Sequence, residues 1–521
     1  MAIAAEPTQR VSHADAAASD LSTLGYQQEL HRSIGSYASF AAGFSFVSIL
    51  TTVFQLFSFG FSFAGPFFFW TWPVVFVGQL MVALCFAELA ARYPLSGAIY
   101  QWARRLGGHI TGWFAGWTMI IAQTVTVAAA AIATQAVLPA IWSGFQLVGG
   151  DPSIATLSGA TNAILLGLIV LVITTTINSV TVRVMALVNA VGVTAELIGA
   201  TLLIIALFTT SVRGPGIVLD NSGVSSFGSL LAAGLMAGYV LVGFDSAGEL
   251  AEETHNPRRT TPRTILRALV FSGIGGGLIL LGALMASPTL GDELAKGGLA
   301  YVVTSRLGDF WGRVFLADVV LAAFICTLAI QTATTRMIYS MSRDEVLPFS
   351  KKLRAISKRG ATVTAAVVVG VGAAALLVIN IGHAGVFTAL TSTCIVLLYI
   401  AYLCVTVPML YRRLTGWPAE LGAQNDETGS PVFSLGRWGL PVNILAVAWG
   451  LAMAINLAWP RQEVYDPEGT SPLLQYFGLI VVALTLVGGV VAFNVKKKAY
   501  RAAIGYPKPV EGAESGVSAG A

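Results

Sequence analysis

Apolar runs of about 20 residues recur along this chain from residue 36 to residue 495, with only short interruptions. Each run is long enough for one helix to cross the hydrocarbon core of a bilayer. Charged residues make up only 11% of the 521 residues, against about 25% in an ordinary soluble domain. The pattern predicts a single all-α polytopic membrane domain and not a string of soluble domains.

The apolar runs predict twelve membrane-spanning helices. We place these spans at residues 36–63, 67–91, 97–137, 160–180, 184–210, 229–252, 264–287, 312–341, 361–381, 384–411, 438–459 and 472–495. Residues 1–33 are polar and lack the basic start and apolar core of a cleavable signal, so we expect the first span to be retained. Residues 1–33 and 496–521 are then the two tails of the chain.

Lys and Arg are distributed unequally between the two sides that this span count defines. One side holds Arg92, Arg183, Arg258, Arg259, Arg263, Lys351, Lys352, Arg354, Lys358, Arg359, Arg412, Arg413, Arg437, Lys496, Lys497 and Lys498. The other side holds Arg213, Lys296, Arg306, Arg313 and Arg461. Because cytoplasmic loops carry the excess of Lys and Arg, both termini are predicted to lie in the cytoplasm, with the spans in the plasma membrane.

The sequence shows none of the residue patterns that mark a metal site or an enzyme active site. The four cysteines lie within apolar runs, and no two of the five histidines have metal-ligand spacing. The sequence has no nucleotide-binding Gly-Lys loop and no serine in a nucleophile elbow. We therefore expect no metal site, no cofactor, no nucleic-acid partner and no enzymatic activity, and any transport must use an ion gradient or exchange.

The first and sixth spans differ from the others in their small and polar residues. The first span contains Gly43, Ser45, Ser48, Thr51, Thr52, Gln55 and Ser58. The sixth contains Gly234, Gly238, Gly243, Ser246 and Gly248 around Asp245. In transporters built from two inverted halves of five helices, interrupted helices at equivalent positions mark a substrate site near the membrane midplane. The first and sixth spans are such a pair.

Asp245, Glu196 and Asp318 fall inside predicted spans, where a charge is expensive and is a functional hypothesis by default. Asp245 has two interpretations: it caps the second half of a broken helix, or it takes up a proton or faces a substrate amine. Glu196 stands alone in the fifth span and is either a proton carrier or a protonated group that hydrogen-bonds a neighbouring helix. Asp318 lies near the end of the eighth span, which favours an interfacial role.

A charged cluster follows the sixth span and contains Glu252, Glu253, Arg258 and Arg259. One interpretation is a solvated mouth in which these four side chains pair with one another at the cytoplasmic surface. The other is a gate in which salt bridges hold the cytoplasmic side closed. Pro257 and Pro262 are expected to end the helix.

Several segments together resemble the amino acid, polyamine and organocation (APC) superfamily of secondary transporters. GFDSAGELAEETHNPRRTTPRTI (residues 243–265) resembles the sixth helix of that superfamily, and TTRMIYSMSRDEVLP (334–348) the end of its eighth. AELAARYPLSGAIYQWARRLGGHITGWFAGW (87–117) is similar to its passage from helix two to helix three. LGYQQELHRSIGSYASFAAGFSFVSIL (24–50) resembles the amino acid and choline branch, which includes GABA permeases.

The resemblance implies two inverted repeats at residues 34–210 and 211–411, two further helices at 412–495, and a substrate between broken helices one and six. The implied substrate-binding residues are Ser48, Ile49, Leu50, Thr51, Thr52, Val242, Gly243, Phe244, Asp245 and Ser246, with Tyr239 as a gating aromatic. The unwound part of helix one is implied at residues 49–52. Many relatives have Gly-x-Gly in helix one, where this chain has Leu50 and Thr52.

The residues and the resemblance together predict a proton-coupled permease for amino acids or a close relative such as GABA. Its partners are then the small-molecule substrate, protons and membrane lipid. Free N–H groups at the helix breaks attract the substrate carboxylate, and protonation of Asp245 or Glu196 biases alternating access. Choline or polyamine uptake, with cation–π contacts from aromatics, remains an alternative. So do exchange of one amino acid for another and a nutrient sensor that binds without transport.

Overall fold

The computed structural model describes residues 21–154, 156–358, 360–381, 386–418, 425–465, 469 and 475–503. Apart from two isolated bridges, regular structure in these residues is entirely helical. Arg359, predicted on the basic side, and most of both predicted tails lie outside the described residues. The all-α class predicted from the apolar runs is confirmed.

Every predicted span coincides with one helix or with a broken pair of helices. The first half comprises α2 (Ser36–Val47), α3 (Ile49–Ala64), α4 (Thr71–Arg92), α5 (Ala98–Ile132), α7 (Leu157–Val180) and α8 (Val182–Thr209). The second half comprises α9 (Phe227–Val240), α10 (Ser246–Glu249), α11 (Pro257–Ala286), α12 (Asp292–Arg343), α14 (Val363–Ile379), α15 (Val386–Leu414), α16 (Gly439–Ala458) and α19 (Phe477–Ala503). Short helices occupy loops: α6 (Leu138–Ile141), α13 (Ser350–Leu353) and α17 (Gln462–Tyr465).

Hydropathy of the observed helices agrees with a polytopic membrane protein. In the described residues, nine helical stretches are long and apolar enough to cross a membrane, and Phe227–Val240 and Val363–Ile379 are shorter apolar helices. The stretch Ser36–Arg92 holds the first two predicted spans together. The chain is thus a multi-pass membrane protein.

Two predicted boundaries are wrong for identifiable reasons. Pro257 does not end a helix but begins α11, and Pro262 lies inside that helix. Pro257 is tolerated as the first residue of α11 because its missing N–H would have no partner there anyway. The eighth span, predicted from residue 312, is part of a longer α12 that begins at Asp292 and bends at Gly298 and Gly308, which have non-helical backbone angles.

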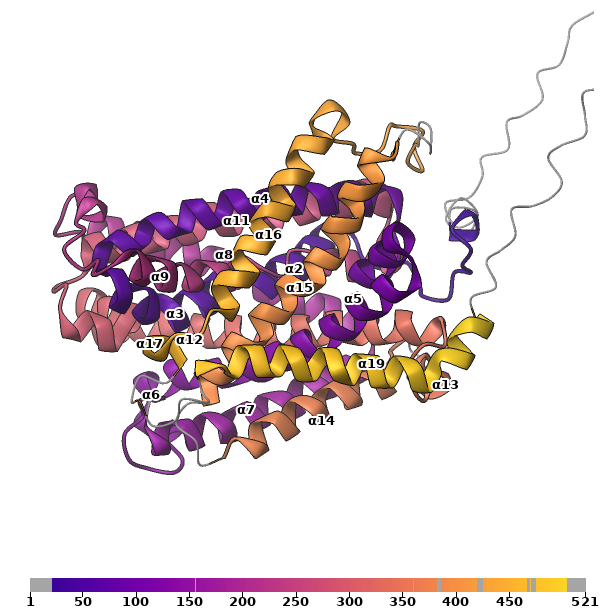
Figure 1. Ribbon diagram of the computed structural model, residues 1–521. Coiled ribbons are helices and arrows are strands. Elements are labelled where there is room, and N and C mark those ends of the chain that lie inside the picture. Colours follow the sequence, from indigo (N-terminus) through magenta and orange to yellow (C-terminus); the bar gives the residue numbers. More distant parts are fainter. Residues whose placement is uncertain are drawn as a thin grey trace, which may run out of the picture.

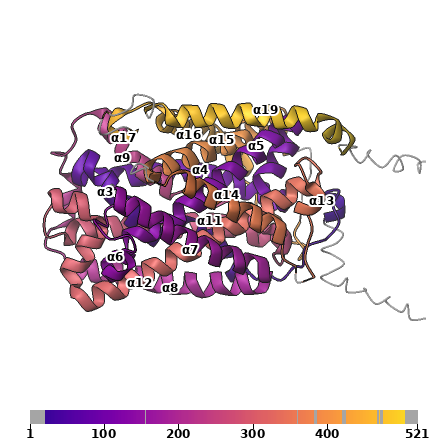
Figure 2. The ribbon, with the colours of Figure 1, turned by 90° about the horizontal axis from the view of Figure 1, so that it is seen from below.

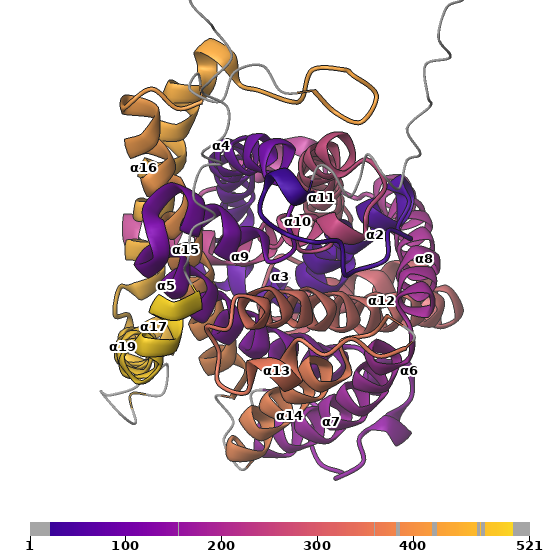
Figure 3. The same cartoon turned by 90° about the vertical axis from the view of Figure 1, so that its right-hand side faces the viewer.

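The long helices lie side by side along the bundle, and the broken helices α2, α3 and α9 lie among them (Figure 1). Helices α16 and α19 lie at the periphery (Figures 2 and 3). The first and last described segments lie at the same end of the bundle, on the right of Figure 1. We call this end, where α4 stops at Arg92 and α12 at Arg343, the basic end, and the opposite one the far end.

Candidate functional site: two helix breaks beside a central cavity

The first break is a single residue, Ser48, between α2 and α3. Its backbone has φ 38° and ψ 80°, the left-handed region that a non-glycine residue rarely occupies. Residues 49–52, expected to be unwound, instead form the first turn of α3, where the N–H of Thr52 already donates to the Ser48 carbonyl at 3.0 Å. The predicted interruption exists, but it is shorter and lies one residue earlier.

Glu196 of α8 caps this break from across the bundle. Its Oε1 accepts a hydrogen bond from Ser48 Oγ at 3.0 Å and another from the Leu50 N–H at 3.3 Å. The side chain is buried, and its second oxygen, Oε2, has no hydrogen-bond partner in the described part of the chain. A carboxylate at a helix N-terminus satisfies free N–H groups and interacts favourably with the helix dipole. Glu196 therefore supplies from α8 the cap that α3 lacks locally.

The second break spans residues 241–245, between α9 and α10, as predicted for residues 242–246 except that Ser246 already begins α10. Gly243 has φ 87°, and a Cβ built there would lie 1.8 Å from the Phe46 ring. Glycine is thus required by the backbone angle and by the approach of α2. The two breaks are held together at this point.

Tyr402 of α15 closes the second break, a role that the sequence did not indicate. Its hydroxyl accepts a hydrogen bond from the Gly243 N–H at 3.0 Å and donates one to Asp245 Oδ1. Asp245 precedes α10 in the chain, but its side chain makes no capping hydrogen bond, so the capping interpretation of Asp245 is wrong. Because Tyr402 lies in the apolar run IVLLYIAYLCV, the sequence alone predicts only a packing role. The fold places its hydroxyl beside the break.

A small cavity lies beside both breaks. Four of the eleven predicted substrate-binding residues line it: Thr51, Thr52, Tyr239 and Val242. The remaining lining residues are Phe46, Val47, Gln55, Thr126, Ala130, Val240, Cys326, Ile330 and Leu398. The lining is therefore apolar and aromatic with a few hydroxyl and amide groups, and none of the described residues in it is charged.

The other predicted substrate-binding residues lie around this cavity and not on its wall. Ser48, Ile49, Leu50, Gly243, Phe244, Asp245 and Ser246 are buried or internal but are absent from its lining. Phe244 packs against Phe86 and Tyr402, with ring centroids 6.2 and 5.8 Å apart. Ser48 and Asp245 thus shape the two breaks, whereas the neighbouring turns of α3 and α9 contribute to the wall of the cavity.

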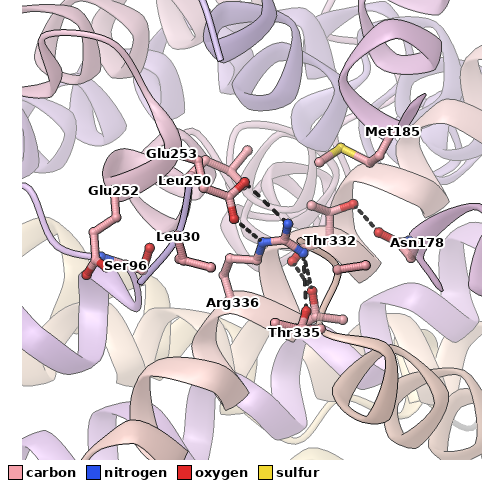
Figure 4. Close-up of polar contacts among 12 residues, drawn as sticks. Leu30, Ser96, Asn178, Met185, Leu250, Glu252, Glu253, Thr332, Thr335 and Arg336 are labelled. Atoms are coloured by element: carbon pink, nitrogen blue, oxygen red, sulfur yellow. Dashed lines mark hydrogen bonds and ion pairs between the residues drawn. The ribbon is translucent and has the colours of Figure 1, made fainter. Parts of the chain in front are cut away.

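Two buried ion pairs join the segment after α10 to α12 at the basic end. Glu252 pairs with Arg343 through two contacts of 2.8 Å and accepts a hydrogen bond from the Ser96 N–H at 3.0 Å. Glu253 pairs with Arg336 at 3.0 and 3.3 Å (Figure 4). Both acids are at most 1% exposed. The two ion pairs therefore hold the segment after α10 against α12.

These contacts correct the expectation of a solvated mouth. Neither Glu252 nor Glu253 pairs with Arg258 or Arg259. Arg258 instead donates to the carbonyls of Ala91 and Arg92, both at 3.2 Å, and Arg259 is exposed. The actual partners of Glu252 and Glu253 lie on α12, 83 or more residues away in the chain. A local charge pattern therefore could not predict them.

The segment before α2 lies over this cluster. The N–H groups of Ser33 and Ile34 donate to the Glu253 carbonyl at 3.0 and 2.9 Å, and the His255 N–H donates to the Ile34 carbonyl at 3.0 Å. The Arg343 guanidinium stacks 4.1 Å above the Tyr26 ring. We call the two ion pairs and residues 26–34 the basic-end gate. In this structure all of these contacts are formed, and whether they act as a gate is tested by the substitution below.

Replacing Glu252 by Gln should loosen the basic-end gate, because the substitution leaves Arg343 buried without its counter-charge. Removing one partner of a buried pair costs about 3–5 kcal/mol. We expect hydrogen–deuterium exchange at the amides of Ser33, Ile34 and His255 to accelerate at least about tenfold. Glu345→Gln is the matched control, since its pair with Arg354 is exposed and 3.5 Å long. Unchanged exchange in Glu252→Gln, or a large loss of substrate affinity, would contradict a gating role.

A helical membrane protein with two helix breaks side by side, a cavity beside them and buried ion pairs at one end has the architecture of many secondary transporters. The chain matches the family model described as amino acid permease over residues 33–486. It belongs to this family of the APC superfamily and is a permease, not an enzyme.

Named relatives agree with this assignment. The amino-acid permease BAT1 of Arabidopsis thaliana is 26% identical over 473 residues, which cover 84% of this chain and 88% of that protein. Its homologue in Oryza sativa is 27% identical over 466 residues, covering 84% and 87%. The thiamine transporter thi9 of Schizosaccharomyces pombe is 25% identical over 524 residues, covering 91% and 84%.

Proposed function

We propose that this permease imports amino acids with uncharged side chains, or a close relative such as GABA, by proton symport across the plasma membrane. The observation that carries the proposal is the hydrogen bonding of Glu196 to the N-terminus of α3, next to a cavity without charged lining. The basic end then faces the cytoplasm, because Lys and Arg concentrate on that side of membrane proteins. The interrupted helices also support inverted repeats at residues 34–210 and 211–411.

Substrate recognition follows from the chemistry of the helix breaks. The N-terminus of α3 attracts a substrate carboxylate, and the carbonyl groups that end α9 attract an ammonium group. Thr51, Thr52 and Gln55 offer further hydrogen-bonding groups in the cavity wall. A substrate with a charged side chain would bury that charge without a counter-charge, which is costly. The uncharged lining therefore favours a net-neutral zwitterion.

Proton coupling follows from competition for the same N–H groups. While Glu196 is ionised, its carboxylate holds Ser48 and the Leu50 N–H and repels an incoming substrate carboxylate. Protonation removes that charge and weakens both hydrogen bonds, because a charged acceptor makes the stronger bond. Proton and substrate then bind together, and the pair biases the two access states by its differential affinity for them.

Asp245 is the second acid that the sequence nominated for proton coupling. Its Oδ1 is engaged by Tyr402, Oδ2 has no hydrogen-bond partner in the described residues, and the side chain does not line the cavity. We assign Asp245 to holding the second break and Glu196 to coupling. The basic-end gate would open only after the proton and the substrate have bound.

Uptake of a labelled panel into proteoliposomes tests the substrate class. The panel contains neutral, basic and acidic amino acids, GABA, choline, putrescine and thiamine, with an imposed proton gradient and without sodium. We expect a neutral amino acid or GABA to accumulate, and a protonophore to abolish the accumulation. Accumulation of choline, putrescine or thiamine alone would overturn the proposal. It would indicate that Phe46 and Tyr239 in the cavity wall bind a cation through cation–π contacts. Countertransport alone would indicate an exchanger, and binding alone a sensor.

A further inference from the structure

A second acid, Asp318 of α12, lies against α8 one helical turn from Glu196. A Cβ built at Gly199 of α8 would lie 1.7 Å from Asp318 Oδ2, and a Cβ at Gly192 would lie 2.3 Å from Ile325. These two contacts set the register of the antiparallel helices, in which residue numbers on α8 rise as those on α12 fall. Glu196 then lies at the level of residue 321, about 4.5 Å along the helix axis from Asp318.

The two acids share a feature that packing alone does not explain. Asp318 Oδ2 and Glu196 Oε2 are both buried oxygens without a hydrogen-bond partner in the described residues. The two carboxyl groups are close enough to interact electrostatically. Gly199 makes room for the Asp318 carboxyl, because any side chain there would occupy the position of Oδ2. A carboxyl oxygen left unsatisfied inside a membrane protein is costly unless it has a use.

Few other charged groups face this pair. Helices α2, α3, α7 and α14, which also pack against α12, carry no Asp, Glu, Lys or Arg. The thiol of Cys326 lies near Glu196 and donates to the Phe46 carbonyl at 3.6 Å. The remaining charged residues of α12 and of the helices packed against it lie toward the two ends of the bundle. Those toward the basic end are Arg104, Arg105, His109, Arg183, Glu249, Arg258, Arg259, Arg263, Arg267, Arg336, Arg343, Lys351 and Lys352, and those toward the far end of α12 are Asp292, Glu293, Lys296, Arg306, Asp309 and Arg313.

We propose that Asp318 is the proton entry residue from the far end, passing its proton to Glu196. Asp318 is partly exposed and lies on the far-end side of Glu196, whereas Glu196 is buried and touches the break in the first span. In the step itself, the Asp318 carboxyl releases a proton to Glu196 and becomes a carboxylate. One water, or rotation of the two side chains, spans the remaining gap. This relay rests on the proposed proton symport.

The test compares Asp318→Asn with the wild-type permease in proteoliposomes and scores two activities. Proton-driven accumulation needs net proton delivery, whereas exchange of labelled for unlabelled substrate does not. We expect the accumulation rate of Asp318→Asn to fall at least about tenfold while the exchange rate stays within about twofold of wild type. Asp309→Asn, which changes an exposed acid on the same helix, should leave both rates unchanged.

Gly199→Ala provides a second variant that keeps the Asp318 carboxyl but displaces it. We expect it to slow accumulation more than exchange, as Asp318→Asn does. Equal loss of both activities in both variants would indicate a structural role and overturn the relay, as would normal accumulation in Asp318→Asn. Wild-type uptake without any proton dependence would instead refute the proposed symport, so the two failures are distinguishable.

Discussion

Glu196→Gln is expected to abolish proton-driven accumulation and to leave exchange largely intact. Glutamine is nearly isosteric and can still accept hydrogen bonds from Ser48 and the Leu50 N–H, so the cap on α3 survives. It cannot carry a proton between the two access states. A gradient of about two pH units supports up to about 100-fold accumulation with one proton per substrate, and the variant should reach only equal concentrations. Labelled-substrate uptake and countertransport in proteoliposomes measure the two activities.

Asp245→Asn is the matched comparison for Glu196→Gln. Both residues are buried acids at a helix break, but Asp245 binds Tyr402 and does not line the cavity. We expect Asp245→Asn to keep proton dependence, although its transport rate can fall if the second break loosens. Loss of proton dependence in Asp245→Asn, with normal coupling in Glu196→Gln, would transfer the coupling role to Asp245.

Gly243→Ala is expected to have an effect of similar size through a different cause. Alanine at φ 87° is strained, and its Cβ would overlap the Phe46 ring at 1.8 Å. Overpacking of this kind costs about 1–3 kcal/mol, and moving Phe46 changes the wall of the cavity. We expect both accumulation and exchange to fall at least about tenfold. Transport rates, normalised to the folded protein measured by size-exclusion chromatography, check this.

Gly234→Ala is the control for that substitution. Gly234 lies within α9, and the nearest atoms to an added Cβ are those of Thr71 at 3.8 Å, an ordinary contact. Alanine also has the higher helix propensity. Normal transport by Gly234→Ala and loss in Gly243→Ala would support the role of the second break. Normal transport by Gly243→Ala would show that the approach of Phe46 is not needed for transport.

The sequence predicted those features that depend on local composition. Apolar runs located every span, and the glycines around Asp245 located the break in the sixth, because a break needs residues that tolerate unusual backbone angles. The first break was placed too late, since Ser48 takes a left-handed conformation that its own side chain does not favour. Its stabilisation comes from Glu196, 148 residues away.

What the sequence missed comes from contacts between distant segments. Tyr402 reaches Asp245 from 157 residues away, and Glu253 finds Arg336 on α12 instead of Arg258 nearby. In the sequence, Arg336 and Arg343 at the end of the eighth span resemble the basic residues of a cytoplasmic loop. In the fold their side chains point inward and pair with Glu253 and Glu252. The sequence alone was enough to identify the acidic residues inside the membrane spans. It was not enough to predict which residues they contact, and therefore not enough to assign them different roles.

Substrate-dependent proton movement in proteoliposomes tests the central claim most directly. Purified wild-type permease is reconstituted with a pH-sensitive dye inside the vesicles, without sodium, and the neutral amino acid or GABA that accumulates in the uptake panel is added outside. We expect acidification of the lumen that requires both substrate and permease and is absent in Glu196→Gln. Uptake of the same substrate without luminal acidification would contradict proton symport and remove Glu196 from the coupling role.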